Sequence, residues 1–266
     1  MKIKFSLLLL FHSVLLSNYV FGQIGKAEVR TWEIEGNTRK AMVYMPKNAT
    51  IASTPVVFAF HGHGGTMENM FRSRGFEKLW PEAIVICPQG LNTPGALTDP
   101  EGKQSGWQKA VGVLGDRDLK FFDAMLIDLK KGYKVDEKAI FVTGHSNGGG
   151  FTYLLWAERG NIFAGLAPTA TVAGRNMQKL IPKPVLHLFG EKDQLVKVDR
   201  QKLTCQQLLK LNNSEAEGVE YARNAKIYNA DSANPVVIYA SSGGHSYPLE
   251  ATAVIVKFFK QIKANG

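Results

Sequence analysis

Cysteine is scarce in this chain of 266 residues, which contains only Cys87 and Cys205. A structural zinc site needs several Cys or His ligands at short spacing, and neither cysteine has such neighbours in the sequence. We therefore expect no metal and no disulfide-rich scaffold. The sequence is compatible with one disulfide and with two buried free thiols. The second alternative fits Cys87, because it ends the apolar run 83–87, which is typical of a buried strand.

Clusters of basic residues are also missing, although the formal net charge is +9. The 32 Lys and Arg residues are scattered, and no run of them exceeds two. A nucleic-acid-binding surface requires clustered basic residues, so we expect a solvated basic surface and no nucleic-acid partner. The Gly-Lys-Ser/Thr ending of a phosphate-binding loop and the Gly-x-Gly-x-x-Gly dinucleotide pattern are absent as well, and no cofactor is expected.

Only the first segment of the chain is strongly apolar over a longer stretch. Residues 5–16 follow a short basic start and precede a small, polar segment near Gly22, which is the layout of a secretory signal peptide. The stretch is short for a membrane span, although an uncleaved anchor would share the pattern. We expect residues 1–22 to be a signal peptide and residues 23–266 to be secreted or periplasmic, without stable membrane insertion. Removal of the two lysines of the signal lowers the net charge from +9 to +7.

Short apolar runs alternate with amphipathic segments along the rest of the chain. Strands are expected at 28–34, 39–45, 56–60, 83–87, 139–143, 163–167, 184–189 and 236–240. Helices are expected at 118–131, at 147–158, at 202–211 and in a last segment striped by Ile255, Phe258, Phe259 and Ile262. Because the inner strands are apolar throughout, we predict an α/β fold of one domain, with a mainly parallel sheet flanked by helices and an opening hairpin at one antiparallel edge. The Gly- and Pro-rich segment 89–115 is expected to be a long functional loop.

The sharpest motif is Gly-His-Ser-Asn-Gly at residues 144–148, between an apolar strand and a helix. This layout holds a serine hydroxyl on a tight turn at the end of a strand, where flanking glycines avoid collisions with the backbone. We predict Ser146 as a nucleophile and the backbone N–H of Asn147, at the positive end of the helix, as an oxyanion donor. An inert serine in a glycine-rich turn is the alternative.

A serine nucleophile needs a histidine base, and two histidines follow Ser146 in the chain. His187 lies inside an apolar strand and is expected in the core. His245 lies in the glycine-rich loop 241–248, between a strand and the last helix, where a base can reach the end of the sheet. We therefore predict His245 as the base, with an ordinary loop histidine as the alternative.

The carboxylate that orients the base should follow a strand between the nucleophile and the base. The segment Phe-Gly-Glu-Lys-Asp at 189–193 fits this position. We predict Asp193 as the acid, with Glu191 and then Asp199 as competitors.

The second oxyanion donor is expected in the loop His-Gly-His-Gly-Gly at 61–65, which follows a buried strand. Glycines let the backbone approach the substrate carbonyl, and we predict the N–H of His63 as the donor, with Gly62 as the alternative. The spacing of the two histidines would also suit a metal, but no third ligand is evident.

Taken together, the chain resembles α/β-hydrolase esterases typified by polyhydroxybutyrate depolymerase-like proteins and by carbohydrate esterase family 1, which includes feruloyl and acetylxylan esterases. The resemblance is carried by the co-linear segments 57–65, 116–122, 142–150, 163–168, 189–193 and 243–248. It implies the α/β-hydrolase fold and the same triad of Ser146, Asp193 and His245. Two features depart from the family: Tyr247 stands where a Trp is usual, and residues 205–235 match poorly.

The expected function is cofactor-free ester hydrolysis through an acyl-enzyme, on feruloyl or acetyl esters of plant-type polysaccharides or their fragments. We expect Trp107 and Tyr247 to bind substrate, while Tyr153 and Trp156 suit the core at least as well. A short-chain polyester depolymerase and a serine peptidase on the same fold are the alternatives. A binding protein without activity is disfavoured, because all three triad positions are filled.

Overall fold

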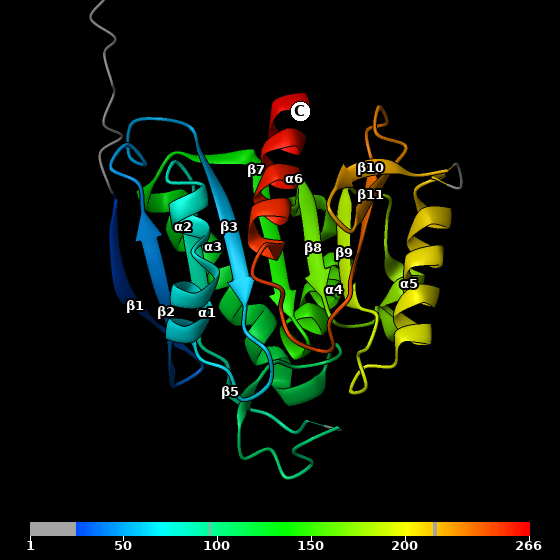
Figure 1. The fold of residues 1–266 in the computed structure, drawn as a ribbon. Helices are drawn as coiled ribbons and strands as arrows, with labels where there is room; N and C mark the ends of the chain where they lie inside the picture. The colour runs from blue at the N-terminus through cyan, green and yellow to red at the C-terminus, as the bar shows by residue number, and fades with distance from the viewer. Residues whose placement is uncertain (1–24, 96, 215–216) are drawn as a thin grey trace, which may run out of the picture.

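One large sheet forms the centre of the computed structural model, which describes residues 25–95, 97–214 and 217–266 (Figure 1). Within these residues ten strands are paired in the order β1-β2-β4-β3-β7-β8-β9-β12-β11-β10. Their bounds are β1 Lys26–Ile34, β2 Asn37–Met45, β3 Thr54–Phe60, β4 Ile84–Pro88, β7 Val135–His145, β8 Gly165–Thr169, β9 Val185–Gly190, β10 Val219–Ala222, β11 Ala225–Tyr228 and β12 Val236–Ser241. The predicted signal peptide at residues 1–22 lies outside the described residues.

The six inner strands, from β4 to β12 in this order, are parallel, and an antiparallel hairpin lies at each edge. The prediction of a mainly parallel sheet with the β1–β2 hairpin at one edge is confirmed. All seven residues of β3 are buried, because helices cover both faces of an inner strand. The β10–β11 hairpin at the other edge was not predicted, since its strands are four residues long and partly exposed.

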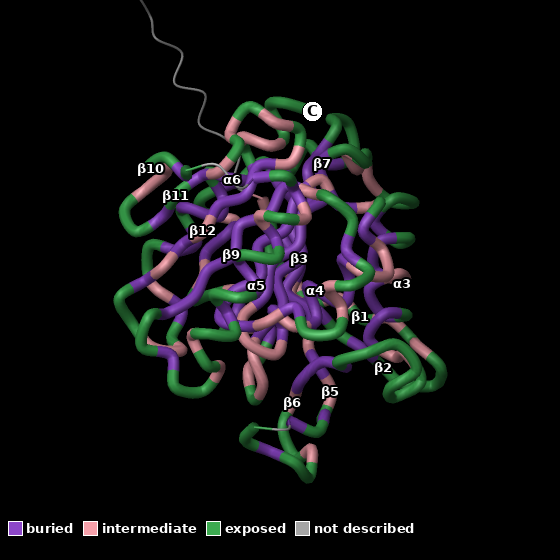
Figure 2. Tube along the Cα trace, turned by 90° about the vertical axis from the view of Figure 1, so that its right-hand side faces the viewer, coloured by how far each residue is buried: buried purple, intermediate pink, exposed green. Residues whose placement is uncertain are grey.

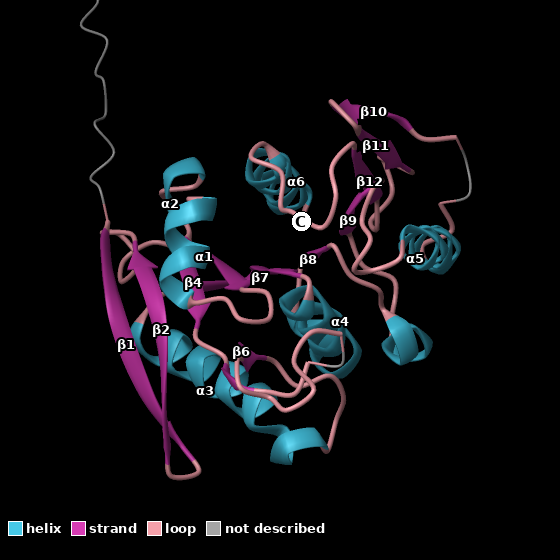
Figure 3. Cartoon of the chain, turned by 60° about the horizontal axis from the view of Figure 1, so that its bottom comes forward, coloured by secondary structure: helices cyan, strands magenta, loops and turns pink. Residues whose placement is uncertain are grey.

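Helices cover the two faces of the sheet in two layers (Figure 3). Their bounds are α1 Met67–Arg74, α2 Phe76–Leu79, α3 Arg117–Gly132, α4 Asn147–Arg159, α5 Val198–Leu211 and α6 Ala251–Asn265, with short 3-10 turns at Val113–Asp116, Gly160–Ile162 and Gly174–Lys179. One apolar core joins the sheet to α3, α4 and α5, and the other joins it to α1, α2 and α6. In α3 the apolar residues Leu119, Phe122 and Leu126 recur at the spacing that lines one face.

The predicted long loop contains a small hairpin of its own, formed by β5 (Leu91–Asn92) and β6 (Ser105–Gly106). It extends beyond the ends of the inner strands, and much of it is exposed, whereas the central strands are buried (Figure 2). The parallel strands also end at this side of the molecule. The start of β1 and the end of α6 lie at the opposite side (Figure 1).

Cys87 and Cys205 are both free and buried. Of the two alternatives left open by the sequence, the structure therefore contains two thiols and no disulfide between them. Burial raises the pKa of Cys205 to about 12 and raises the pKa of Cys87 further still.

Candidate active site

Ser146 lies at the sharp turn between β7 and α4, with a backbone φ of 54° and ψ of −115°. This region is unfavourable for residues other than glycine, so the neighbouring structure must hold the turn in place. A Cβ on Gly144 would lie 2.3 Å from the carbonyl oxygen of Gly148, and a Cβ on Gly148 would lie 2.4 Å from that of Phe60. The two flanking glycines are therefore required by close backbone packing around the serine.

The structure brings the three predicted triad residues together. The Nε2 atom of His245 is 2.8 Å from the Oγ atom of Ser146, and its Nδ1 atom is 2.8 Å from the Oδ2 atom of Asp193. Both distances allow proton transfer from the hydroxyl to an imidazole that a carboxylate orients. Glu191 and Asp199, the competing acids, are exposed.

Asp193 is held by more donors than the histidine alone. Its Oδ1 atom accepts hydrogen bonds from the backbone N–H groups of Leu195 and Val196, both at 2.9 Å, and its Oδ2 atom also accepts one from Gln201 at 3.0 Å. Burial acts to raise the pKa of Asp193, but the hydrogen bonds from His245, Val196 and Gln201 lower it overall. The carboxylate therefore stays ionised and fixed beside the base. The buried Gln201 was missed in the sequence, because no local motif marks it.

The two predicted oxyanion donors face the same cleft as Ser146. Among the described residues, the backbone N–H groups of His63 and Asn147 have no hydrogen-bond partner, which leaves them available to a ligand. The imidazole of His63 lies 3.0 Å from Asp99, and the side-chain amide of Asn147 bonds the backbone N–H and carbonyl of Trp107 at 2.7 and 3.1 Å. These side chains anchor the backbone segments that carry the donors.

Three other histidines near the sheet are kept neutral by burial. Burial lowers the pKa of His61 to about 4 and that of His187 to about 3, and burial together with the neighbouring His245 lowers the pKa of His145 to about 3. His187 lies in the core, as predicted, within 2.7 Å of the hydroxyl of Tyr153. His245 is therefore the histidine placed to act as the base.

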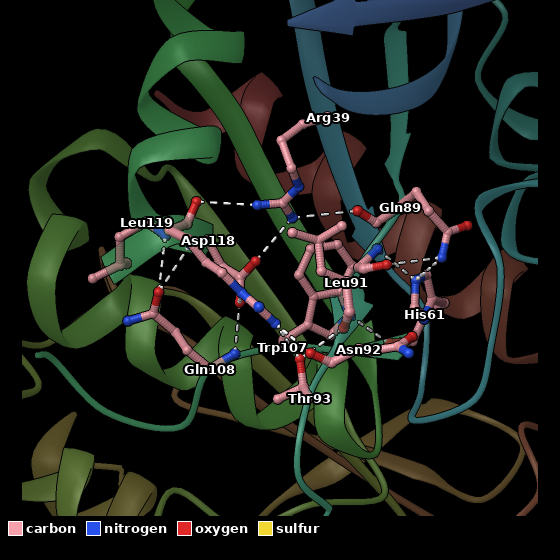
Figure 4. A network of polar contacts seen from close by, with 12 residues as sticks. Arg39, His61, Gln89, Leu91, Asn92, Thr93, Trp107, Gln108, Asp118 and Leu119 are labelled. Atoms are coloured by element: carbon pink, nitrogen blue, oxygen red, sulfur yellow. Dashed lines mark hydrogen bonds and ion pairs between the residues drawn. The ribbon is translucent and has the colours of Figure 1, made fainter. Parts of the chain in front are cut away.

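The predicted substrate-binding roles of Trp107 and Tyr247 are not supported, because neither side chain lines the cleft. Trp107 is completely buried, and its indole N–H donates a hydrogen bond to the carbonyl of His61 at 2.8 Å (Figure 4). Tyr247 is buried, and the guanidinium of Arg74 lies 4.0 Å from the centre of its ring. Both aromatic residues support the loops of the site from behind.

A cleft of about 800 Å³ opens at Ser146. Besides the triad and oxyanion candidates, its walls include part of the loop after β5 (Gly95, Leu97 and Thr98), the segments 108–110 and 171–176, and residues 195–197 with Arg200. Sequence reasoning identified the first two as parts of a long functional loop but gave no role to 171–176. Among the described residues no group of three or more His, Cys, Asp and Glu side chains is arranged for a metal ion.

The matching family model is described as the dienelactone hydrolase family and spans residues 40–262. The chain is 25% identical over 166 residues to a bifunctional acetylxylan esterase/xylanase of Neocallimastix patriciarum and 29% identical over 146 residues to feruloyl esterase D of Neurospora crassa. These matches cover 61% and 49% of the chain but 22% and 44% of the two relatives, so the chain spans less than half the length of either.

Solved structures match over a larger share of the chain. A ferulic acid esterase matches 90% of this chain and 98% of its own with a TM-score of 0.64 at 14% identity. An acetyl xylan esterase from Aspergillus awamori matches 88% and 99% with a TM-score of 0.62 at 15% identity. The predicted α/β-hydrolase fold is confirmed, and the relatives confirm the resemblance to acetylxylan and feruloyl esterases.

Proposed function

The chain belongs to the dienelactone hydrolase family, and on this premise we propose that it is a serine hydrolase that cleaves carboxylic esters through an acyl-enzyme. The observation that carries the proposal is the unbroken line of contacts from Asp193 through His245 to Ser146, each 2.8 Å long. The strained turn at Ser146 opens into a cleft that is large enough for a drug-sized ligand.

In the first step, His245 takes the proton of the Ser146 hydroxyl as the oxygen attacks the ester carbonyl. The backbone N–H groups of His63 and Asn147 stabilise the resulting oxyanion, and His245 then protonates the departing alcohol. In the second step, His245 takes a proton from water as the water attacks the acyl-enzyme, and it then returns the proton to Ser146 as the acid product leaves. Asp193 keeps Nδ1–H of the base pointed at the carboxylate, so that Nε2 faces the serine.

The proposed substrates are feruloyl or acetyl esters on plant-type polysaccharides or their fragments. Relatives named as acetylxylan and feruloyl esterases support this choice, as does the proposed export of the chain through a signal peptide at residues 1–22. No helix in the described part of the chain is long and apolar enough to cross a membrane.

The test is an assay of the chain from residue 23 onwards and of its Ser146→Ala variant on a matched panel. The panel contains 4-nitrophenyl acetate, methyl ferulate, acetylated xylan, a hydroxybutyrate oligomer and a peptide anilide. We expect turnover of acetyl or feruloyl esters by the wild type and a loss of at least about 10⁴-fold in the variant. Preference for the hydroxybutyrate oligomer or the anilide would replace the proposed substrate class, and turnover that survives in the variant would exclude Ser146 as the nucleophile.

A further inference from the structure

A buried ion pair lies outside the triad and contacts Gln108, which lines the cleft. The Nη2 atom of Arg39 is 2.8 Å from the Oδ1 atom of Asp118, and the two side chains are 1% and 0% exposed. The same guanidinium donates hydrogen bonds to the carbonyls of Arg117 and Gln89 and packs over the ring of Phe121. Burying two charges costs stability that ordinary apolar packing would not cost, so the pair calls for a role beyond filling space.

The second carboxylate oxygen of Asp118 holds the loop segment that follows the small hairpin. Its Oδ2 atom accepts a hydrogen bond from the backbone N–H of Gln108 at 2.8 Å, and the Oε1 atom of Gln108 accepts one from the backbone N–H of Asp118 at 3.0 Å. Asp118 and Gln108 therefore fix each other's position through two reciprocal hydrogen bonds (Figure 4). Neither contact involves a triad residue.

Trp107, the neighbour of Gln108, contacts both segments that carry the oxyanion donors. Its backbone N–H and carbonyl bond the side-chain amide of Asn147, and its indole N–H bonds the carbonyl of His61, two residues before His63. From the other side, Gln89 accepts a hydrogen bond from Arg39, and the N–H of the next residue donates one to Nε2 of His61 at 3.0 Å. Two series of hydrogen bonds thus connect the ion pair to the backbone segments that carry the oxyanion donors.

We propose that Asp118 is a positioning residue for the oxyanion hole, acting with Arg39 through Gln108 and Trp107 on the backbone at His63 and Asn147. The inference rests on the proposed esterase function. Oxyanion donors work only when they lie about 2.7–3.1 Å from the charged oxygen, and a shift of about 1 Å in a catalytic group costs about 100-fold in rate. Ground-state binding of the ester depends much less on that alignment.

The test compares Asp118→Asn with Asp123→Asn. For each variant kcat and KM are measured with 4-nitrophenyl acetate, and kcat is expressed per active site, counted by labelling with a phosphonate ester. Asp123 lies on the same helix and forms its own ion pair with Arg159 at 2.8 Å, away from Gln108 and Trp107. We expect Asp118→Asn to lower kcat per site about 10- to 100-fold, with KM within about threefold and the midpoint of the pH profile unchanged, because His245 is untouched. Asp123→Asn should keep wild-type kcat.

Two further variants keep the test decisive if Asp118→Asn does not fold. Arg39→Lys retains the buried positive charge but loses the guanidinium fork, and Trp107→Phe removes the indole N–H together with part of the buried ring. We expect each to lower kcat per site with little change in KM, Arg39→Lys by less than about tenfold. A fall in melting temperature with wild-type kcat per site in the folded variants would overturn the proposal and leave the ion pair a purely structural feature. A wild type that hydrolyses no ester would instead refute the proposed function.

Discussion

At the scale of single residues, the site depends on how firmly His245 is aligned. It contacts Ser146 and Asp193 with its two ring nitrogens, and the acid is itself fixed by the N–H groups of Leu195 and Val196 and by Gln201. Because every one of these groups donates to the acid, the carboxylate is favoured over the neutral form. The orientation of the base follows from this arrangement.

We expect Asp193→Asn to lower kcat by about 10⁴-fold with little change in KM. The amide would present an N–H₂ group to Nδ1 of His245 and so favour the tautomer that cannot accept the serine proton. The measurement is kcat and KM with 4-nitrophenyl acetate at neutral pH. Asp199→Asn, which changes an exposed carboxylate nearby, serves as the control and should match the wild type. A loss below about tenfold in Asp193→Asn would mean that another group orients the base.

The mutual contact of Ser146, His245 and Asp193 could be predicted because each of them follows a recognisable apolar strand in its own stretch of sequence. Trp107 and Tyr247 could not be placed in this way. Their burial depends on partners far along the chain, namely the carbonyl of His61 for the first and the guanidinium of Arg74 for the second. An aromatic residue in a glycine-rich loop looks the same in sequence whether it faces a ligand or supports a loop from behind.

At the scale of elements, the end of β9 is pressed against the loop that carries the base. A Cβ on Gly190 would lie 2.0 Å from the carbonyl oxygen of Gly244 and 2.6 Å from that of Gly243. Both are backbone atoms, so the loop itself would have to move. The spacing between β9 and this loop therefore sets the position of His245.

We expect Gly190→Ala to lower kcat more than about tenfold and to lower the melting temperature, because the loop of His245 is displaced from Ser146. Kinetics and thermal unfolding measure the two effects. Gly132→Ala is the control, since no atom lies within 4 Å of its added Cβ at the end of α3. The control should keep wild-type kcat and gain or lose less than about 1 kcal/mol of stability. Equal behaviour of the two variants would show that the loop is not held by this contact.

Most elements could be predicted from sequence because the inner strands are continuously apolar and the helices carry clear stripes. Helices α1 and α2, of eight and four residues, were not predicted. Two further features also escaped prediction. The β10–β11 hairpin is short and half-exposed, so its sequence resembles a loop. The path of the segment 89–115 depends on long-range hydrogen bonds, such as that from the N–H of Gly64 to the carbonyl of Ser105 at 2.7 Å, which no local pattern encodes.

At the scale of the whole molecule, buried histidines make the fold sensitive to acid. The pKa of His187 falls from 6.5 to about 3 and that of His61 from 6.5 to about 4, because burial disfavours the charged ring. Below pH 6.5 the unfolded chain therefore binds protons that the folded chain does not. Stability is lost as the pH falls from 6.5 towards these lowered values, at about 1.4 kcal/mol per pH unit for each fully buried histidine.

We expect His187→Gln to weaken this dependence by about 1.4 kcal/mol per pH unit between pH 6 and pH 4. Glutamine can still accept a hydrogen bond from Tyr153 but does not titrate. Urea unfolding of both proteins at pH 7, 6, 5 and 4 gives the two slopes. Parallel slopes would show that His187 takes up its proton in the folded state.

The two thiols lead to a second expectation for the whole molecule. Because Cys87 and Cys205 are buried and burial raises the pKa of each, neither should react with a thiol-specific reagent in the native protein. Two thiols per chain should be labelled after unfolding, and a reducing agent should leave the melting temperature unchanged. Labelling of the native chain would indicate local opening around α5 or β4, and fewer than two thiols after unfolding would indicate oxidation.

The placement of the chain ends has a practical consequence for handling the molecule. The start of β1 and the end of α6 both lie on the side of the sheet away from the ends of the parallel strands (Figure 1). The cleft lies at the ends of the strands, because Ser146, which lines it, directly follows β7. A tag or a surface attached through either end would leave the cleft mouth facing outward. Immobilised on a bead by its last helix, the molecule would keep Ser146 and its cleft turned away from the bead.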